Sequence, residues 1–153
     1  MKKMAFAVLA VSTLLSANSP AKDKGKAMED VVWPAESVKW EAGPVAGTKV
    51  AKLWGDWMKG GPYGVLVKFD AGQVNALHHH THALKIVIMS GTFVHKSDGA
   101  PETKLGPGSY LMQAPGKKHV SGCATGADCT FFMTSDGKFE LIDDSKAAAS
   151  DKK

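Results

Sequence analysis

Residues 72–91 read GQVNALHHHTHALKIVIMSG and contain four of the six histidines of this 153-residue chain. In an extended strand alternate side chains point to the same face, so His78, His80 and His82 would share one face and His79 would point to the other. Three imidazoles on one face can bind a metal ion. The stretch therefore predicts a metal site carried by a strand.

The spacing of this stretch resembles the first sequence signature of the cupin superfamily. Gly72 is followed by His78, His80 and Gly91 at the intervals of that signature. Leu84 stands where the family carries a glutamate. The resemblance implies the family's barrel, with a site that lacks the usual carboxylate.

A segment further along the chain resembles the second cupin signature. It reads GSYLMQAPGKKH and runs from Gly108 to His119, which falls where the family has its third ligand histidine. The family's proline is displaced by one place, to Pro115, and Cys123 stands where an asparagine often occurs. The motifs LWGD (53–56), KGGPYG (59–64) and HVSGC (119–123) further resemble those of an uncharacterised group of secreted, single-domain cupins. This resemblance covers residues 30–142.

The resemblance implies a metal centre on His78, His80 and His119, with His82 as a reserve ligand that a bulge would turn away. Neutral imidazoles suit iron, zinc, nickel or copper, so the expected cofactor is a divalent transition metal. The alternative reading of such a run is an exposed loop that binds metal adventitiously. His95 belongs to no motif and is expected to be solvated or hydrogen-bonded, with contact to the pocket or the metal site as the alternative.

The rest of the chain predicts an all-β fold. Short apolar, β-branched runs alternate with glycine- and proline-containing turns, and they add up to about ten strands without a long amphipathic helix. The last two strands are expected to form a hairpin across Asp136 and Gly137. This pattern indicates an antiparallel barrel or sandwich, in agreement with the cupin-type double-stranded β-helix, or jelly-roll barrel, that the resemblance implies.

The ends of the chain differ from its middle. Residues 1–21 have the basic start and the apolar run, of 14 residues, of a signal peptide. That run is shorter than a bilayer-spanning helix of roughly 20 residues, although an uncleaved anchor is the alternative. Residues 22–30 are expected to form a flexible lead-in, residues 31–142 the cupin domain and residues 143–153 a polar tail. The prediction is a periplasmic or secreted protein, with no membrane association after signal removal.

The charge argues against nucleic acid as a partner. The chain has 19 lysines and no arginine, so the bidentate group that grips phosphates and guanine edges is missing. The formal charge of +4 falls to +2 when the signal, with Lys2 and Lys3, is removed. The expected partner is a small molecule inside the barrel, and the sequence leaves open whether two copies form a homodimer.

Two cysteines, Cys123 and Cys129, flank the turn-like sequence ATGAD. In an exported protein the simplest interpretation is a structural disulfide, which should contribute roughly 2 to 3 kcal/mol to stability. A redox-active pair lacks the usual CxxC spacing. A Cys123 thiolate on the metal is a further alternative.

Two functions from different classes fit these features. The first is an exported metal-binding cupin of unknown substrate, whose three-histidine centre binds a small molecule in the barrel. The second is a metal-dependent cupin enzyme, such as a dioxygenase with a three-histidine iron centre. The sequence offers no evident general acid or base beside the histidines, and metal identity would separate the two.

Overall fold

The computed structural model describes residues 29–145, and the fold presented here is that of the compact unit beginning at Trp33. The predicted signal peptide, residues 1–21, and most of the predicted lead-in lie outside the described residues, as does the tail from residue 146. Within the described part, no helix is long and apolar enough to span a membrane.

Apart from one short 3₁₀ turn, η1 (Ala35–Ser37), every regular element of the described residues is a strand. The strands are β1 (Glu41–Ala42), β2 (Thr48–Trp54), β3 (Tyr63–Phe69), β4 (Val74–His79), β5 (Leu84–Ser90), β6 (Phe93–Ser97), β7 (Thr103–Leu105), β8 (Tyr110–Gln113), β9 (His119–Cys123), β10 (Cys129–Ser135) and β11 (Ile142–Asp143).

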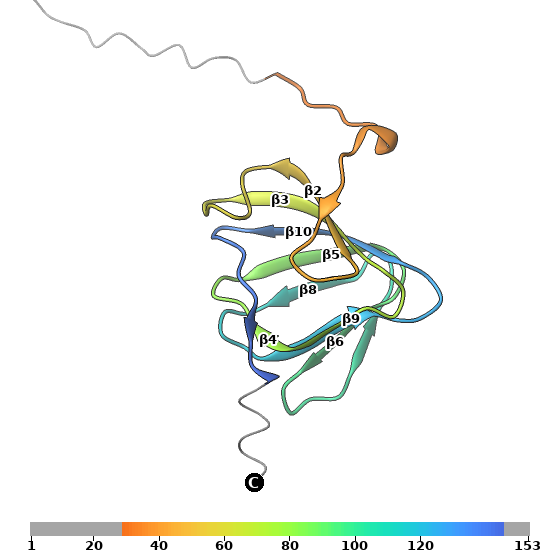
Figure 1. Ribbon diagram of the computed structural model, residues 1–153, viewed down its shortest axis with the longest axis vertical. Coiled ribbons are helices and arrows are strands. Elements are labelled where there is room, and N and C mark those ends of the chain that lie inside the picture. Colours follow the sequence, from red (N-terminus) through yellow and green to blue (C-terminus); the bar gives the residue numbers. More distant parts are fainter. Residues whose placement is uncertain (1–28, 146–153) are drawn as a thin grey trace, which may run out of the picture. The chain divides into compact units, whose positions relative to one another are not determined.

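These strands form two antiparallel sheets that face each other (Figure 1). One sheet has the order β1-β2-β3-β10-β5-β8 and the other β11-β4-β9-β6-β7. From β3 onward the chain changes sheet at almost every connection, so that strands close in sequence lie in opposite sheets. This is a jelly-roll arrangement, and it confirms the predicted all-β cupin-type fold.

The core follows the two-residue period of the strands. In β3 the side chains of Tyr63, Val65, Val67 and Phe69 alternate inward and are buried, and β10 shows the same alternation. Phe69 packs edge-on against Phe131 at 5.0 Å between ring centroids. Burying these side chains supplies the main stabilisation of the fold.

The expected hairpin across Asp136 and Gly137 is wrong. β10 ends at Ser135 and the chain crosses to the other sheet, where Ile142 of β11 pairs with His79 of β4. The physical reason is that β10 already has β3 and β5 on its two edges, so no edge remains for a hairpin partner. The fold also extends past residue 142, because Asp144 is buried.

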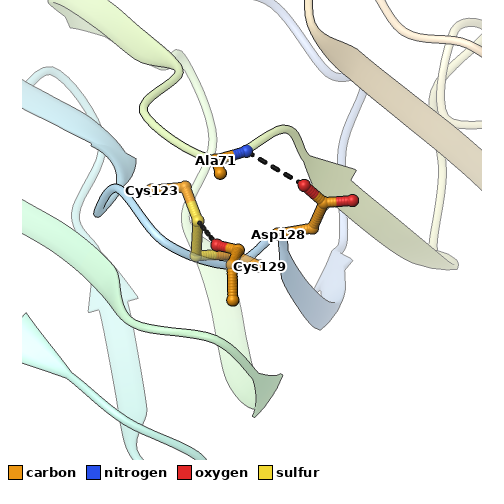
Figure 2. Close-up of a disulfide and its surroundings, with 5 residues drawn as sticks. Ala71, Cys123, Asp128 and Cys129 are labelled. Carbon is orange, nitrogen blue, oxygen red and sulfur yellow. Dashed lines mark hydrogen bonds between the residues drawn. A yellow bond between two sulfur atoms is a disulfide. The ribbon is translucent and has the colours of Figure 1, made fainter.

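A disulfide joins the two sheets at one end of the barrel. Cys123 at the end of β9 is bonded to Cys129 at the start of β10, with 5.7 Å between their Cα atoms (Figure 2). In the loop between them, Asp128 accepts a hydrogen bond from the backbone N–H of Ala71 at 3.0 Å. Gly91 packs against this loop, and a Cβ there would lie 2.4 Å from the Asp128 carbonyl oxygen, so only glycine fits.

Candidate metal centre

The site begins with a bulge in β4. Asn75 and His78 are both buried although they are three residues apart, and the register with β9 shifts between them. The extra residue restores the inward direction for His78. His78 then stands directly opposite His119 of β9, and their ring centroids are 4.3 Å apart.

His80 completes the group from just beyond the end of β4. Its ring centroid is 5.0 Å from that of His78 and 5.2 Å from that of His119. The backbone of His80 is hydrogen-bonded to the loop before β9: the N–H of Gly116 donates to the His80 carbonyl at 2.8 Å. Phe139 packs on the imidazole at 5.4 Å. The segments carrying the three histidines are thus fixed to one another by backbone pairing.

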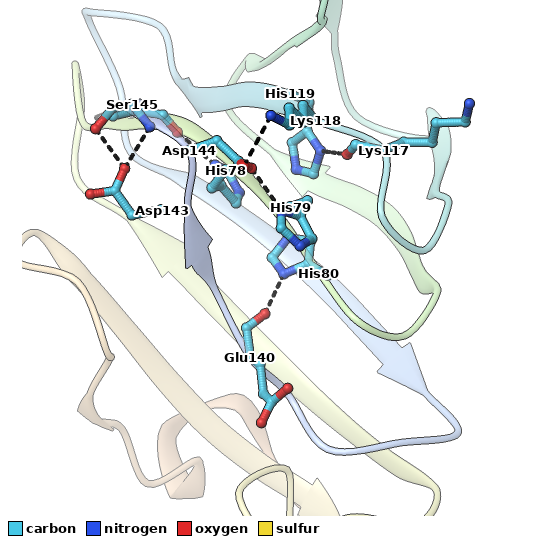
Figure 3. Close-up of polar contacts among 11 residues, drawn as sticks. His78, His79, His80, Lys117, Lys118, His119, Glu140, Asp143, Asp144 and Ser145 are labelled. Atoms are coloured by element: carbon cyan, nitrogen blue, oxygen red, sulfur yellow. Dashed lines mark hydrogen bonds and ion pairs between the residues drawn. The ribbon is translucent and has the colours of Figure 1, made fainter. Parts of the chain in front are cut away.

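Each of the three rings has the same hydrogen-bonding arrangement, partly visible in Figure 3. Nδ1 of His78 lies 2.7 Å from the Ala76 carbonyl, Nδ1 of His80 lies 2.7 Å from the Glu140 carbonyl, and Nδ1 of His119 lies 2.9 Å from the Lys117 carbonyl. A carbonyl oxygen can only accept, so Nδ1 carries the proton in every ring. The lone pair of Nε2 is therefore free on all three, which is the second-nitrogen bonding typical of metal-binding histidines.

The charge state agrees with this tautomer. Burial lowers the pKa of His80 and of His119 to about 4, and it also lowers the pKa of His78. All three rings are neutral at pH 7, as metal ligation requires. One ligand atom from each lies within 4.8 Å of the others, and Nε2 of His119 is buried without a hydrogen-bond partner in residues 29–145. The donor set fits a transition metal such as zinc or iron.

An outer network ties these segments together (Figure 3). Nδ1–H of His79, between two of the grouped histidines, donates to Oδ2 of Asp144 at 2.6 Å. Nζ of Lys118, which precedes His119, lies 3.3 Å from Oδ1 of the same carboxylate. The hydrogen bond from His79 is the main reason that the pKa of Asp144 is lowered. Asp144 thus connects β11 to the strand ends that carry the histidines.

A small, partly open cavity of about 50 Å³ adjoins two of the three histidines. His78 and His80 contribute to its wall, and the polar groups of Asn75, Ser121 and Gln113 do so as well. The rest of the wall is mainly apolar and includes Val50, Trp57, Val67, Phe69, Leu84, Ile86, Phe93, Phe131, Met133 and Phe139. Such a space suits a small, partly apolar ligand held by few polar contacts.

The structure brings together three of the four histidines predicted from the sequence. His82 lies outside the group because β4 ends at His79 and the chain bends before β5, so strand alternation does not reach it. Its exposed imidazole covers Gly137, where a Cβ would overlap the ring. Leu84 is 2% exposed and lines the cavity, as expected for the position of the family's glutamate.

Two features of the site escaped the sequence reading. Asp144 falls in the stretch predicted as a polar tail, and Glu140 contributes through its backbone carbonyl, which carries no sequence signal at all. His95 is half-buried and its ring centroid is 5.1 Å from that of His119. The sequence left open whether His95 reaches the pocket or solvent, and the pairing of β6 with β9 brings it close to the group.

Comparison with solved structures gives cupin neighbours of low sequence identity. The polyketide cyclase RemF from Streptomyces resistomycificus has a TM-score of 0.64 and 18% identity, covering 76% of this chain and 85% of that one. An RmlC-like cupin from Shewanella frigidimarina has a TM-score of 0.56 and 22% identity, with coverages of 71% and 92%. A chain from the complex of Rhodobacter sphaeroides SigE with the anti-sigma ChrR has a TM-score of 0.54 and 20% identity, with coverages of 67% and 51%. These likenesses support the fold alone.

A match to a protein-family model shows the family of this chain. None of the curated proteins compared with the chain matches it. The model described as the ChrR cupin-like domain matches residues 28–139, which is more than half of the chain and includes all three grouped histidines. The chain therefore belongs to the ChrR cupin-like family of the cupin superfamily.

Proposed function

We propose that this protein is an exported cupin that holds a divalent transition metal on His78, His80 and His119 and receives a small molecule in the adjoining cavity. The observation that carries the proposal is the common tautomer of the three rings, each with Nδ1–H bound to a backbone carbonyl. Three buried rings that present unprotonated nitrogens to one another are poorly explained by packing alone.

The lining of the cavity and the charge of the proposed metal ion indicate what kind of ligand would bind. Three neutral imidazoles leave the full charge of a divalent ion uncompensated, and Leu84 adds an apolar surface in place of a carboxylate. The ligand should therefore be small, should carry an anionic or oxygen donor for the metal, and should have an apolar part.

Elemental analysis of the untagged protein, purified from its natural compartment, tests the metal. We expect close to one equivalent of a transition metal per chain. His119→Ala should lower metal affinity by at least about tenfold, because a ligand is lost. His82→Ala is the matched control and should bind as the wild type does. Equal losses in both variants would make His82 a ligand, and full binding by His119→Ala would leave only adventitious surface binding.

Export has its own test. The mature chain should begin near residues 20–22 and be recovered outside the cytoplasm, because the predicted signal would be cleaved there. N-terminal sequencing of protein from fractionated cells measures both properties. Recovery of the full-length chain from the cytoplasm would contradict export without affecting the metal proposal.

A metal-dependent enzyme is the second candidate. A metal held by only three histidine nitrogens would retain further coordination positions, at which a chelating substrate or oxygen could bind. Structural neighbours with the same fold include the polyketide cyclase RemF and the DMSP lyase DddQ from Ruegeria pomeroyi. Native iron would favour this candidate, as oxygen chemistry needs a redox metal, whereas zinc would favour binding or hydrolysis.

A further inference from the structure

His95 has a buried ring nitrogen that the proposed ligand set does not use. On β6 it stands opposite Ser121 of β9, whose side chain lines the cavity. Nε2 of His95 lies 3.2 Å from Oγ of Ser97. Nδ1 is buried and has no hydrogen-bond partner among the described residues. A buried polar nitrogen without a partner is costly, so a missing partner is expected there.

His95 is not a fourth metal ligand in this arrangement, because its ring nitrogens do not lie close enough to all three grouped histidines at once. Among the described residues, one ligand atom each of His78, His80 and His119 lie within 4.8 Å of one another. Neither ring nitrogen of His95 belongs to that group. Nitrogens on one ion are at most about 4 Å apart, since each bond is near 2.1 Å. A group bound to the ion extends further, however, and the His95 ring adjoins that of His119 at 5.1 Å.

We propose that Nδ1–H of His95 recognises a small anion bound at the three-histidine centre, an inference that rests on the proposed function. The anion is favoured because neutral imidazoles and Leu84 leave the metal's positive charge uncompensated. When the Ser97 hydroxyl donates to Nε2 of His95, the ring must carry its proton on Nδ1. That N–H then donates to the anion, and His95 becomes a specificity residue for anionic ligands such as azide or a short carboxylate.

The test uses cobalt-loaded protein, in which visible absorption reports both metal binding and azide binding. His95→Leu should weaken azide binding by about tenfold or more, the effect of losing a hydrogen bond to a charged group, while cobalt affinity stays unchanged. His95→Asn places an amide N–H near the position of Nδ1 and should restore most of the azide affinity. His95→Gln places its amide near the position of Nε2 and should behave like His95→Leu.

Each outcome has a separate meaning. Azide affinity equal to wild type in both His95→Leu and His95→Gln overturns the inference, and a parallel loss of cobalt affinity would instead make His95 a ligand. Failure of the wild-type protein to bind cobalt would remove the proposed function and the inference with it. If His95→Leu does not fold, the Asn and Gln pair decides, and His82→Leu serves as a control that should change neither affinity.

Discussion

Leu84 occupies the cavity wall where a glutamate would bring a negative charge to the centre. It pairs with Gln113 of β8 and is almost fully buried. A leucine excludes water and leaves the charge of a bound metal uncompensated, which favours anionic ligands. The chemistry of the site thus depends on a residue that binds nothing itself.

Replacing this residue tests that view. Leu84→Glu should tighten metal binding and weaken azide binding, since a carboxylate near the ion lowers its net charge and competes for a position. Without metal, the buried carboxylate should lower the free energy of unfolding by several kcal/mol, on the order of 3. Leu84→Gln is the control, because it has the shape without the charge. Titrations that show no change in Leu84→Glu would mean that the side chain does not face the ion.

The buried histidines also predict how the stability of the metal-free protein depends on pH. Burial holds the pKa of His80 and His119 at about 4, against the ordinary value of 6.5. Between these values the unfolded chain binds protons that the native state does not. The free energy of unfolding should therefore fall as pH falls from 6.5 toward 4, by an amount on the order of 1 kcal/mol per histidine.

Urea unfolding of metal-free protein at about pH 7.5 and pH 5 measures this dependence. Glu140 and Asp144 have lowered pKa values, so their titration falls below this window. A variant with His119→Gln should show a smaller difference between the two pH values. Equal midpoints for the wild type at both values would contradict the neutral, buried state of the rings.

At the scale of elements, β11 holds the ligand strands together from outside. Its Ile142 pairs with His79, and the next buried residue, Asp144, contacts both His79 and Lys118. The segment leading into β11 also supplies the carbonyl that fixes the tautomer of His80. The last strand of the described chain therefore acts on the geometry of the site without contributing a ligand.

Asp144→Asn should weaken metal binding by up to about tenfold, the lower end of the effects seen for outer-shell partners, because the strand ends bearing the ligands lose their common anchor. Isothermal titration with zinc measures the change. Asp136→Asn is a suitable control, since Asp136 is exposed and its ion pair with Lys85 lies on the surface. Zinc affinity unaltered in Asp144→Asn would assign the network to stability alone.

At the scale of the whole molecule, the site and the disulfide lie at separate places along the same strand. β9 begins with His119 and ends with Cys123, about 13 Å further along if each residue rises 3.3 Å. The disulfide links the two sheets at the point where the chain leaves β9 and enters β10 of the other sheet. Stabilisation of the barrel and metal binding should therefore be separable.

Replacing both Cys123 and Cys129 by serine should lower the free energy of unfolding by about 2 kcal/mol, because the unfolded chain regains the entropy of the short loop. Metal affinity should stay close to that of the wild type. Denaturant unfolding and zinc titration measure the two effects, and Thr125→Ala in the same loop controls for local changes. A double variant that folds but no longer binds zinc would show that the disulfide also supports the site.

The local sequence was sufficient to predict most of the strands and turns and the shared face of His78 and His80, because the two-residue period of a strand and the turn preference of glycine and proline act over few residues. The likeness to two cupin signatures added the fold and His119. These predictions depend on neighbours along the chain or on a recognisable motif, and the all-β cupin fold among them is confirmed.

Only the tertiary structure decided which residues that are distant in sequence become neighbours in the fold. The bulge before His78, the bend that separates His82, the crossing of β11 to the second sheet and the contact of Asp144 with His79 all depend on which strand edges remain free. The carbonyls that set the tautomers come from backbone positions, which look alike in every residue type. Local sequence patterns carry no information about which distant segments pair, because the free energy of that pairing is gained only when the two sheets pack together.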